Sequence, residues 1–90
     1  MTKWTDCVGP GWYNLVLTVE LAAQKKNVEI AQVKEKFGTL RIYTETSDSD
    51  LNTIINTAEK LSEVICEFCG SPGTLRNTHG WLKTACDFHT

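Results

Sequence analysis

No stretch of this chain approaches the roughly 18 consecutive apolar residues that predict a membrane-spanning helix. The polar residues from Met1 to Asp6 are not followed by the apolar core of a signal peptide, which predicts a cytoplasmic protein. Low-complexity tracts are absent and the aromatic content of 9% is ordinary, so wholesale disorder is not expected. The formal net charge of -2 excludes a strongly basic domain, the simplest kind of nucleic-acid-binding protein.

The length of 90 residues allows one domain rather than two, and we expect residues 1–90 to form it. A chain of this size buries only roughly 60–65% of the surface of its unfolded form. Its hydrophobic core is therefore small, and small cores usually need a disulfide or a metal ion to support them.

The cysteines and histidines near the C-terminus supply such a support. Cys66 and Cys69 form one C-x-x-C pair, and Cys86 and His89 form a C-x-x-H pair after sixteen intervening residues. Tetrahedral zinc takes four sulfur or nitrogen ligands at about 2.0–2.3 Å, and each pair reaches one side of such an ion. The spacing predicts a structural Zn²⁺ site made by Cys66, Cys69, Cys86 and His89.

Other interpretations of these residues fit less well. Two disulfides are disfavoured by the missing secretion signal and by the short spacing of Cys66 and Cys69. A redox motif needs a helix beginning at its second cysteine, whereas Gly70 to Gly73 predicts a turn. Four good ligands close the site, which argues against a catalytic zinc, and His89 argues against a four-thiolate iron site.

Two further residues have candidate roles. We expect Cys7 to be a small buried residue near the N-terminus. His79 follows Thr78 in the tip of a predicted hairpin, so it is a weaker alternative to His89 as a ligand because the tip points away from the metal.

Apolar periodicity predicts the elements before the metal site. Apolar residues recur at three- and four-residue steps from Trp12 to about Lys26, which predicts a helix that stops at Asn27. Strands are expected over 31–37 and 40–45, joined by a tight turn at Gly38-Thr39. The predicted core residues of this hairpin are Val33, Phe37, Leu40 and Ile42.

The polar segment 46–50 supplies N-cap candidates for a second helix. Leu51, Ile54, Ile55, Ala58, Leu61 and Ile65 form its apolar stripe, which predicts a core-facing helix over 51–65 that runs into Cys66. Residues 66–90 then predict a zinc-bound β-hairpin with a treble-clef-like arrangement. The fold class is therefore α+β, with an α-β-β-α part over 1–65 and a zinc-binding part over 66–90.

Four segments carry a likeness to a known group. They are Gly11-Trp12, the stretch from Val33 to Tyr43 that contains KEKFGTLRIY, the stretch from Cys66 to Gly73, and the stretch from Gly80 to His89. With them the chain resembles a set of small uncharacterised zinc-binding proteins encoded by bacteriophages, prophages and bacterial genomes. The resemblance implies a phage or prophage origin and a zinc-binding C-terminus, and it brings no activity with it.

The residues favour a non-catalytic accessory protein that binds a macromolecule. No motif joins Cys7, His79 or Glu35 into a catalytic group, and no Gly-rich phosphate loop is present. A protein partner is preferred, with Trp81 or Tyr13 as a candidate anchor, because aromatic side chains dominate binding hot spots.

Nucleic-acid binding is the alternative, and binding of a small ligand or nucleotide is a further one. Five basic residues lie on or near the two predicted hairpins: Lys34, Lys36, Arg41, Arg76 and Lys83. Lys34 and Lys36 share one face of a strand, where they could contact phosphates. Glu35 and Glu45 lie among these basic residues in the sequence and argue against a continuous basic surface. The simpler explanation of the lysines is that they keep a solvated hairpin edge from aggregating.

Overall fold

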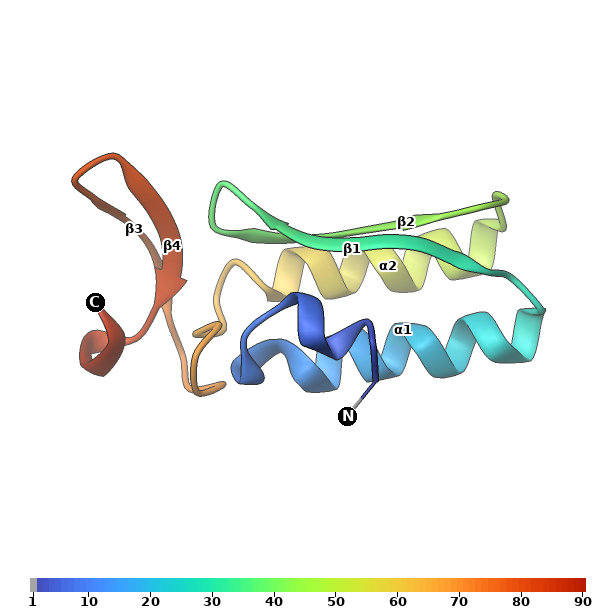
Figure 1. Cartoon of the computed structure of the whole chain (residues 1–90), viewed down its shortest axis with the longest axis horizontal. Helices are drawn as coiled ribbons and strands as arrows, with labels where there is room; N and C mark the ends of the chain where they lie inside the picture. The colour runs from blue at the N-terminus through green and yellow to red at the C-terminus, as the bar shows by residue number, and fades with distance from the viewer. Residues whose placement is uncertain (1) are drawn as a thin grey trace.

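Residues 2–90 fold into two α-helices and two antiparallel β-hairpins, so the α+β class is confirmed (Figure 1). The structure is a computed structural model and describes residues 2–90. Its elements are α1 (Tyr13–Lys26), β1 (Ile30–Lys36), β2 (Thr39–Thr44), α2 (Ser49–Leu61), β3 (Thr74–Thr78), β4 (Trp81–Ala85) and three short 3-10 helices, η1 (Thr5–Cys7), η2 (Pro10–Trp12) and η3 (Asp87–His89). Within the described residues, no helix is both long and apolar enough to cross a membrane.

The first helix begins and ends where local chemistry dictates. The 3-10 helix at Pro10–Trp12 leads directly into α1. Asn27 adopts the left-handed conformation with a φ of 54°, and its N–H donates to the carbonyls of Ala23 and Gln24. Asparagine tolerates this backbone region well, so the predicted stop at Asn27 is confirmed.

One hydrophobic core lies between the two helices and a single face of the β1–β2 hairpin. Its buried residues come from η2 and the four elements from α1 to α2: Trp12, Val16, Val19, Ala23, Val33, Leu40, Ile42, Leu51, Ile55 and Ala58. Alternate residues of a strand point to opposite faces, so the neighbours of these strand residues face away from the core. Both helices lie on the core side of the hairpin, and no helix or strand of residues 2–90 covers its other side (Figure 1).

The turn of the first hairpin differs from its prediction. Lys36 pairs with Thr39, so the two turn residues are Phe37 and Gly38, with φ of 53° and 86°. Positive φ at both positions defines the type I′ turn that suits the twist of a two-residue hairpin loop. Phe37 therefore leaves the strand and is 67% exposed, so its predicted place in the core was wrong.

The outer edge of β2 is occupied by side chains of α2 and of the residue after it. The N–H of Leu40 donates to Ser62 Oγ at 2.9 Å, and the N–H of Ile42 donates to Glu59 Oε2 at 3.0 Å. Both donors would otherwise be unpaired, because the sheet has only two strands. These hydrogen bonds fix the hairpin against α2.

The second helix is shorter than predicted at its C-terminal end. It ends at Leu61, and Leu61 is 43% exposed rather than part of the buried stripe. The Ser62 hydroxyl, fully buried, donates back to the carbonyl of Glu59 and also accepts the Leu40 N–H. Such side-chain bonds to the backbone compete with helix continuation, so the chain turns here and reaches Cys66 as a loop.

The N-terminus of α2 gives a test by pH. Asp48 caps the helix by accepting the Leu51 N–H at 2.9 Å. That hydrogen bond holds the pKa of Asp48 below its usual value. The ammonium group of Lys26, whose Nζ lies 3.6 Å from the carboxylate, lowers the pKa further. A depressed carboxyl pKa stabilises the folded state above the pKa of the unfolded chain, about 4, and this stability is lost as pH falls through the folded pKa.

We expect Asp48→Ala to lower the melting temperature at neutral pH and to reduce the loss of stability in acid. Asp48→Asn is the matched control, because asparagine is an equally good N-cap without the charge. It should melt above Asp48→Ala at pH 7 and share its weaker acid dependence. Thermal unfolding followed by circular dichroism, repeated at pH values from about 3 to about 7, measures both effects. Identical melting curves for Asp48→Ala and the wild type would contradict this role.

Candidate metal centre

Four side chains with metal-binding atoms converge at the C-terminal end of the molecule. Cys66 and Cys69 come from the loop after α2, Cys86 follows β4, and His89 ends η3. One donor atom from each lies within 4.8 Å of the other three. The structure thus brings together all four residues that the sequence predicted as ligands, and they are placed to hold a metal ion.

Two of the distances between donor atoms match the edges of a coordination tetrahedron, and a third is shorter than such an edge. Cys69 Sγ lies 3.6 Å from Cys86 Sγ, and His89 Nδ1 lies 3.7 Å from Cys66 Sγ and 3.1 Å from Cys86 Sγ. Zinc–sulfur and zinc–nitrogen bond lengths imply edges of roughly 3.5–3.8 Å. A disulfide needs sulfurs about 2.05 Å apart, so these thiols are not bonded to one another.

Backbone N–H groups surround the three sulfurs in a repeated pattern. The N–H group two positions further along the chain acts to lower the pKa of each thiol: that of Phe68 for Cys66, that of Ser71 for Cys69 and that of Phe88 for Cys86. Hydrogen bonds to the charged form of a group favour that form. The local backbone is therefore shaped for thiolates, which are the form of cysteine that binds metal.

The acidity of the three thiols differs. Hydrogen bonds from the side chain and the backbone of Ser71 lower the pKa of Cys69 to about 7. Burial acts to raise the pKa of Cys66, but the N–H groups of Cys86, Phe68 and Cys69 outweigh it, and the pKa is lowered. Burial raises the pKa of Cys86. A cation at the centre would favour the thiolate of all three.

A tight turn holds the first ligand pair. The N–H of Gly70 donates to the carbonyl of Cys66 at 2.9 Å, and the N–H of Cys66 donates to the carbonyl of Ser71 at 2.7 Å. Gly70 has a φ of 84°, a region that glycine reaches without strain. The predicted turn after Cys69 is confirmed, and it explains why no helix begins at this cysteine.

The N-terminal segment packs directly on this metal-binding turn. The N–H of Gly11 donates to the carbonyl of Glu67 at 2.7 Å, and the indole Nε1 of Trp12 donates to the carbonyl of Ile65 at 2.9 Å. A Cβ at Gly11 would lie 1.9 Å from the carbonyl oxygen of Cys66, so only glycine fits. The segment thus connects the main core to the candidate metal centre.

The turn of the first hairpin docks on the second hairpin. The Thr84 hydroxyl, fully buried, donates to the carbonyl of Gly38 at 2.7 Å. The Glu35 carboxylate accepts the N–H of Gly38 and so braces the same turn. These contacts give the segment from Lys34 to Gly38 a structural role that the sequence did not reveal.

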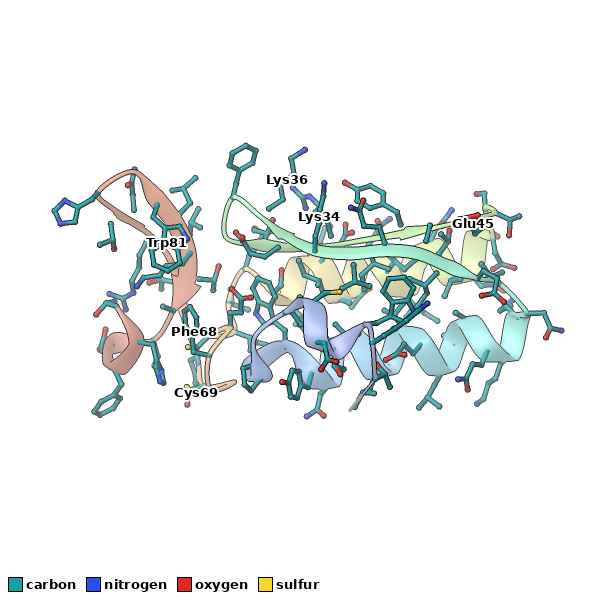
Figure 2. The ribbon with its side chains drawn as sticks, viewed as in Figure 1. Lys34, Lys36, Glu45, Phe68, Cys69 and Trp81 are labelled. Atoms are coloured by element: carbon teal, nitrogen blue, oxygen red, sulfur yellow. The ribbon has the colours of Figure 1, made fainter. Side chains whose placement is uncertain are left out.

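The predicted basic residues separate into two groups. Lys83 is only 8% exposed, and its Nζ lies 4.9 Å from the ring centroid of Trp81 and 5.9 Å from that of Phe68. Arg76 donates to Asp87 at 2.7 Å. Lys34, Lys36 and Arg41 lie instead on β1 and β2, away from these partners; Figure 2 shows Lys34 and Lys36 apart from Trp81 and Phe68.

The remaining candidate residues of the sequence lie outside the metal centre. Cys7 is exposed, so its predicted burial was wrong; it ends η1, and its thiol reaches only the carbonyl of Lys3, at 3.4 Å. His79 is the first residue of the β3–β4 turn and is exposed, outside the ligand cluster. Trp81 is 59% exposed, whereas Tyr13 is half-buried.

Sequence reasoning missed two residues that support the centre. Ser71 hydrogen-bonds to Cys69, and its position two residues after a ligand was an available signal. Glu67 is 9% exposed and accepts the N–H of Gly9 at 3.0 Å, and burial raises its pKa. Its partner lies 58 residues earlier in the chain, so no local pattern indicated it.

Comparison with protein-family models, with curated proteins and with solved structures finds no match to this chain.

Proposed function

We propose that the chain is a non-catalytic accessory protein, stabilised by one structural Zn²⁺, that acts by binding another macromolecule. The observation that supports it best is the closed set of donors at Cys66, Cys69, Cys86 and His89. Catalytic zinc sites keep one position for water, whereas structural sites take four protein ligands. Three thiolates and one imidazole are a frequent structural zinc set.

The architecture around the ligands supports a treble-clef-like module. A ligand-bearing turn at Cys66 to Gly70 precedes the β3–β4 hairpin, and the second ligand pair follows on η3. The main core and the small cluster of Cys66, Ala85 and Cys86 are separate hydrophobic groups. A bound ion would join the ends of the second part, which buries few apolar side chains of its own.

Two classes of partner follow from the sequence, with protein preferred. The exposed ring of Trp81 supports a protein contact, and the half-buried Tyr13 supports it less. A specific observation favours the alternative: three of the five predicted basic residues share one sheet face. The proposal includes a phage or prophage origin and a binding role in the host cytoplasm, for which the resemblance in the sequence is the support.

Metal analysis of the purified full-length protein tests the proposed centre. We expect one zinc ion per chain and, after exchange with Co²⁺, the intense visible absorption of tetrahedral cobalt with thiolate charge-transfer bands. Cys69→Ser should lose these bands, whereas Cys7→Ser should keep them because Cys7 lies outside the cluster. Metal-free protein with an unchanged fold would contradict the proposal.

A further inference from the structure

The exposed face of the first hairpin is a separate feature that the metal centre does not explain. Side chains alternate along β1 and β2, so the residues between the buried Val33, Leu40 and Ile42 point away from the core. We call this surface the basic face; it consists of Gln32, Lys34, Lys36, Thr39, Arg41 and Tyr43. No helix covers it, and Figure 2 shows Lys34 and Lys36 projecting from the side opposite the helices.

Three cations share this face without a carboxylate among them. Lys34 is directly opposite Arg41 in the strand pairing, and Lys36 is the next outward residue on β1. Within residues 2–90, ion pairs are formed only by Lys26 and Arg76, so these three charges are unpaired. Residues 30–44 carry three cations and one carboxylate, a local charge of +2 in a chain of -2.

The two acidic residues that interrupt this segment in the sequence do not lie beside Lys34 and Lys36 in space. Glu35 lies on the opposite face of β1, and its carboxylate accepts the N–H of Gly38. Glu45 lies beyond the end of β2, remote from the two lysines in Figure 2. The face is therefore more basic than the composition indicates.

Exposed aromatic rings flank the cations. Tyr43 is 43% exposed, and Lys34 Nζ lies 5.7 Å from its ring centroid. Phe37 is 67% exposed, and Lys36 Nζ lies 5.8 Å from its ring centroid. Each ring thus has an ammonium group beside it. The pair of Tyr43 and Lys34 and the pair of Phe37 and Lys36 each combine a ring that can stack on a base with a cation that can contact a phosphate.

Phe37 also occupies a conformation that disfavours it. Its φ of 53° lies in the left-handed region, which a bulky residue rarely adopts, and its ring stays largely exposed. Asparagine followed by glycine is the preferred sequence for this turn type. Strain of this kind at an exposed residue is a feature of functional sites.

We propose that the basic face binds single-stranded nucleic acid, with Lys34, Lys36 and Arg41 on phosphates and Tyr43 and Phe37 stacking on bases. This inference rests on the proposed macromolecule-binding role, and the charges and rings of the basic face favour nucleic acid over the protein partner that the sequence preferred. Flat strand surfaces with cations and exposed rings suit unpaired bases, which present a π-face to stack on. A duplex hides those faces in its base stack, so the two exposed rings beside the cations favour a single strand.

Fluorescence anisotropy of labelled oligothymidylate with the metal-loaded full-length protein tests this proposal. Three phosphate contacts predict that log K falls with log salt with a slope of about -2, since each contact on a single strand contributes roughly -0.7. Lys36→Gln should reduce the slope to about -1.4. Lys60→Gln changes the charge equally at an exposed position in the last turn of α2 and should leave the slope unchanged.

Two aromatic variants separate binding from folding. Phe37→Asn should raise the melting temperature, because it relaxes the turn, and yet weaken binding roughly fivefold or more through the lost stacking. Tyr43→Ala should weaken binding by a similar factor, whereas Tyr43→Phe keeps the ring and should remain within about twofold of wild type. A purely structural role cannot make a more stable variant bind less.

Three results would overturn the assignment. The first is no binding at low salt by protein whose zinc content and circular dichroism are intact, which would leave the metal-supported fold standing. The second is equal salt slopes for Lys36→Gln and Lys60→Gln. The third is polyglutamate competing as well as unlabelled oligothymidylate, which would assign the basic face to an acidic protein.

Discussion

Loss of the metal is expected to unfold residues 66–90 and to weaken the rest of the molecule. Structural zinc contributes apparent binding energy of order 10 kcal/mol to small domains, which is comparable to the whole stability of a domain this size. The C-terminal part has little else to hold it, because its own buried apolar cluster consists of Cys66, Ala85 and Cys86 with Phe68 packed against it.

The damage should spread to the first part through defined contacts. Glu67 accepts a hydrogen bond from Gly11, and Thr84 donates one to Gly38. These bonds persist only while the second part is folded. We therefore expect α1 and α2 to remain formed after chelation but to melt at a lower temperature.

Amide NMR spectra with and without a strong chelator measure this directly. Signals of residues 66–90 should collapse toward random-coil positions and recover when zinc is returned. Cys66→Ser should reproduce the chelated spectrum, and Cys7→Ser is the matched control because its thiol is exposed and outside the cluster. A native spectrum for Cys66→Ser would refute the dependence on metal.

The second large effect is expected at Gly11. Alanine there would place its Cβ 1.9 Å from the carbonyl oxygen of Cys66 and 2.5 Å from the N of Gly70. Both are backbone atoms of the metal-binding turn, so neither can rotate aside, and the loop must separate from the turn. This movement would break the hydrogen bond from Gly11 to Glu67 and shift the fully buried Trp12.

We expect Gly11→Ala to lower the free energy of unfolding by about 3 kcal/mol or more. Gly80→Ala is the control: its φ is 86°, but no atom lies within 4 Å of the added Cβ. The strained backbone alone should cost about 1 kcal/mol. Urea unfolding of both metal-loaded variants measures the two losses of unfolding free energy. Equal losses would contradict the role of the close contact between Gly11 and the metal-binding turn.

The predictions that succeeded depended on local periodicity and spacing. The repeat from Trp12 to Ala23 determines one helix face, and Asn27 ends the helix by its own backbone preference. The two ligand pairs are close in sequence, so their convergence needed only that the chain turn back once. Local patterns of this kind carry their structural information within a few residues.

The failures concern features that depend on distant parts of the chain. Phe37 was predicted to be a core residue because it would share one face of the expected strand with Val33. The pairing of Lys36 with Thr39 instead places Phe37 in the turn, where it is exposed. Lys83 looked like a surface charge, yet Trp81 and Phe68 enclose it, and Phe68 comes from another segment. The basicity of the outer sheet face likewise required knowing where Glu35 points.

The side chains along β2 have a consequence for self-association. A two-stranded sheet offers free donors on which strands of other copies can assemble into fibres. Here the N–H groups of Leu40 and Ile42 are already engaged by Ser62 and Glu59, so these two donors are not free for an incoming strand. Growth of the sheet past β2 would require α2 to detach first, which protects the protein from polymerising along this border.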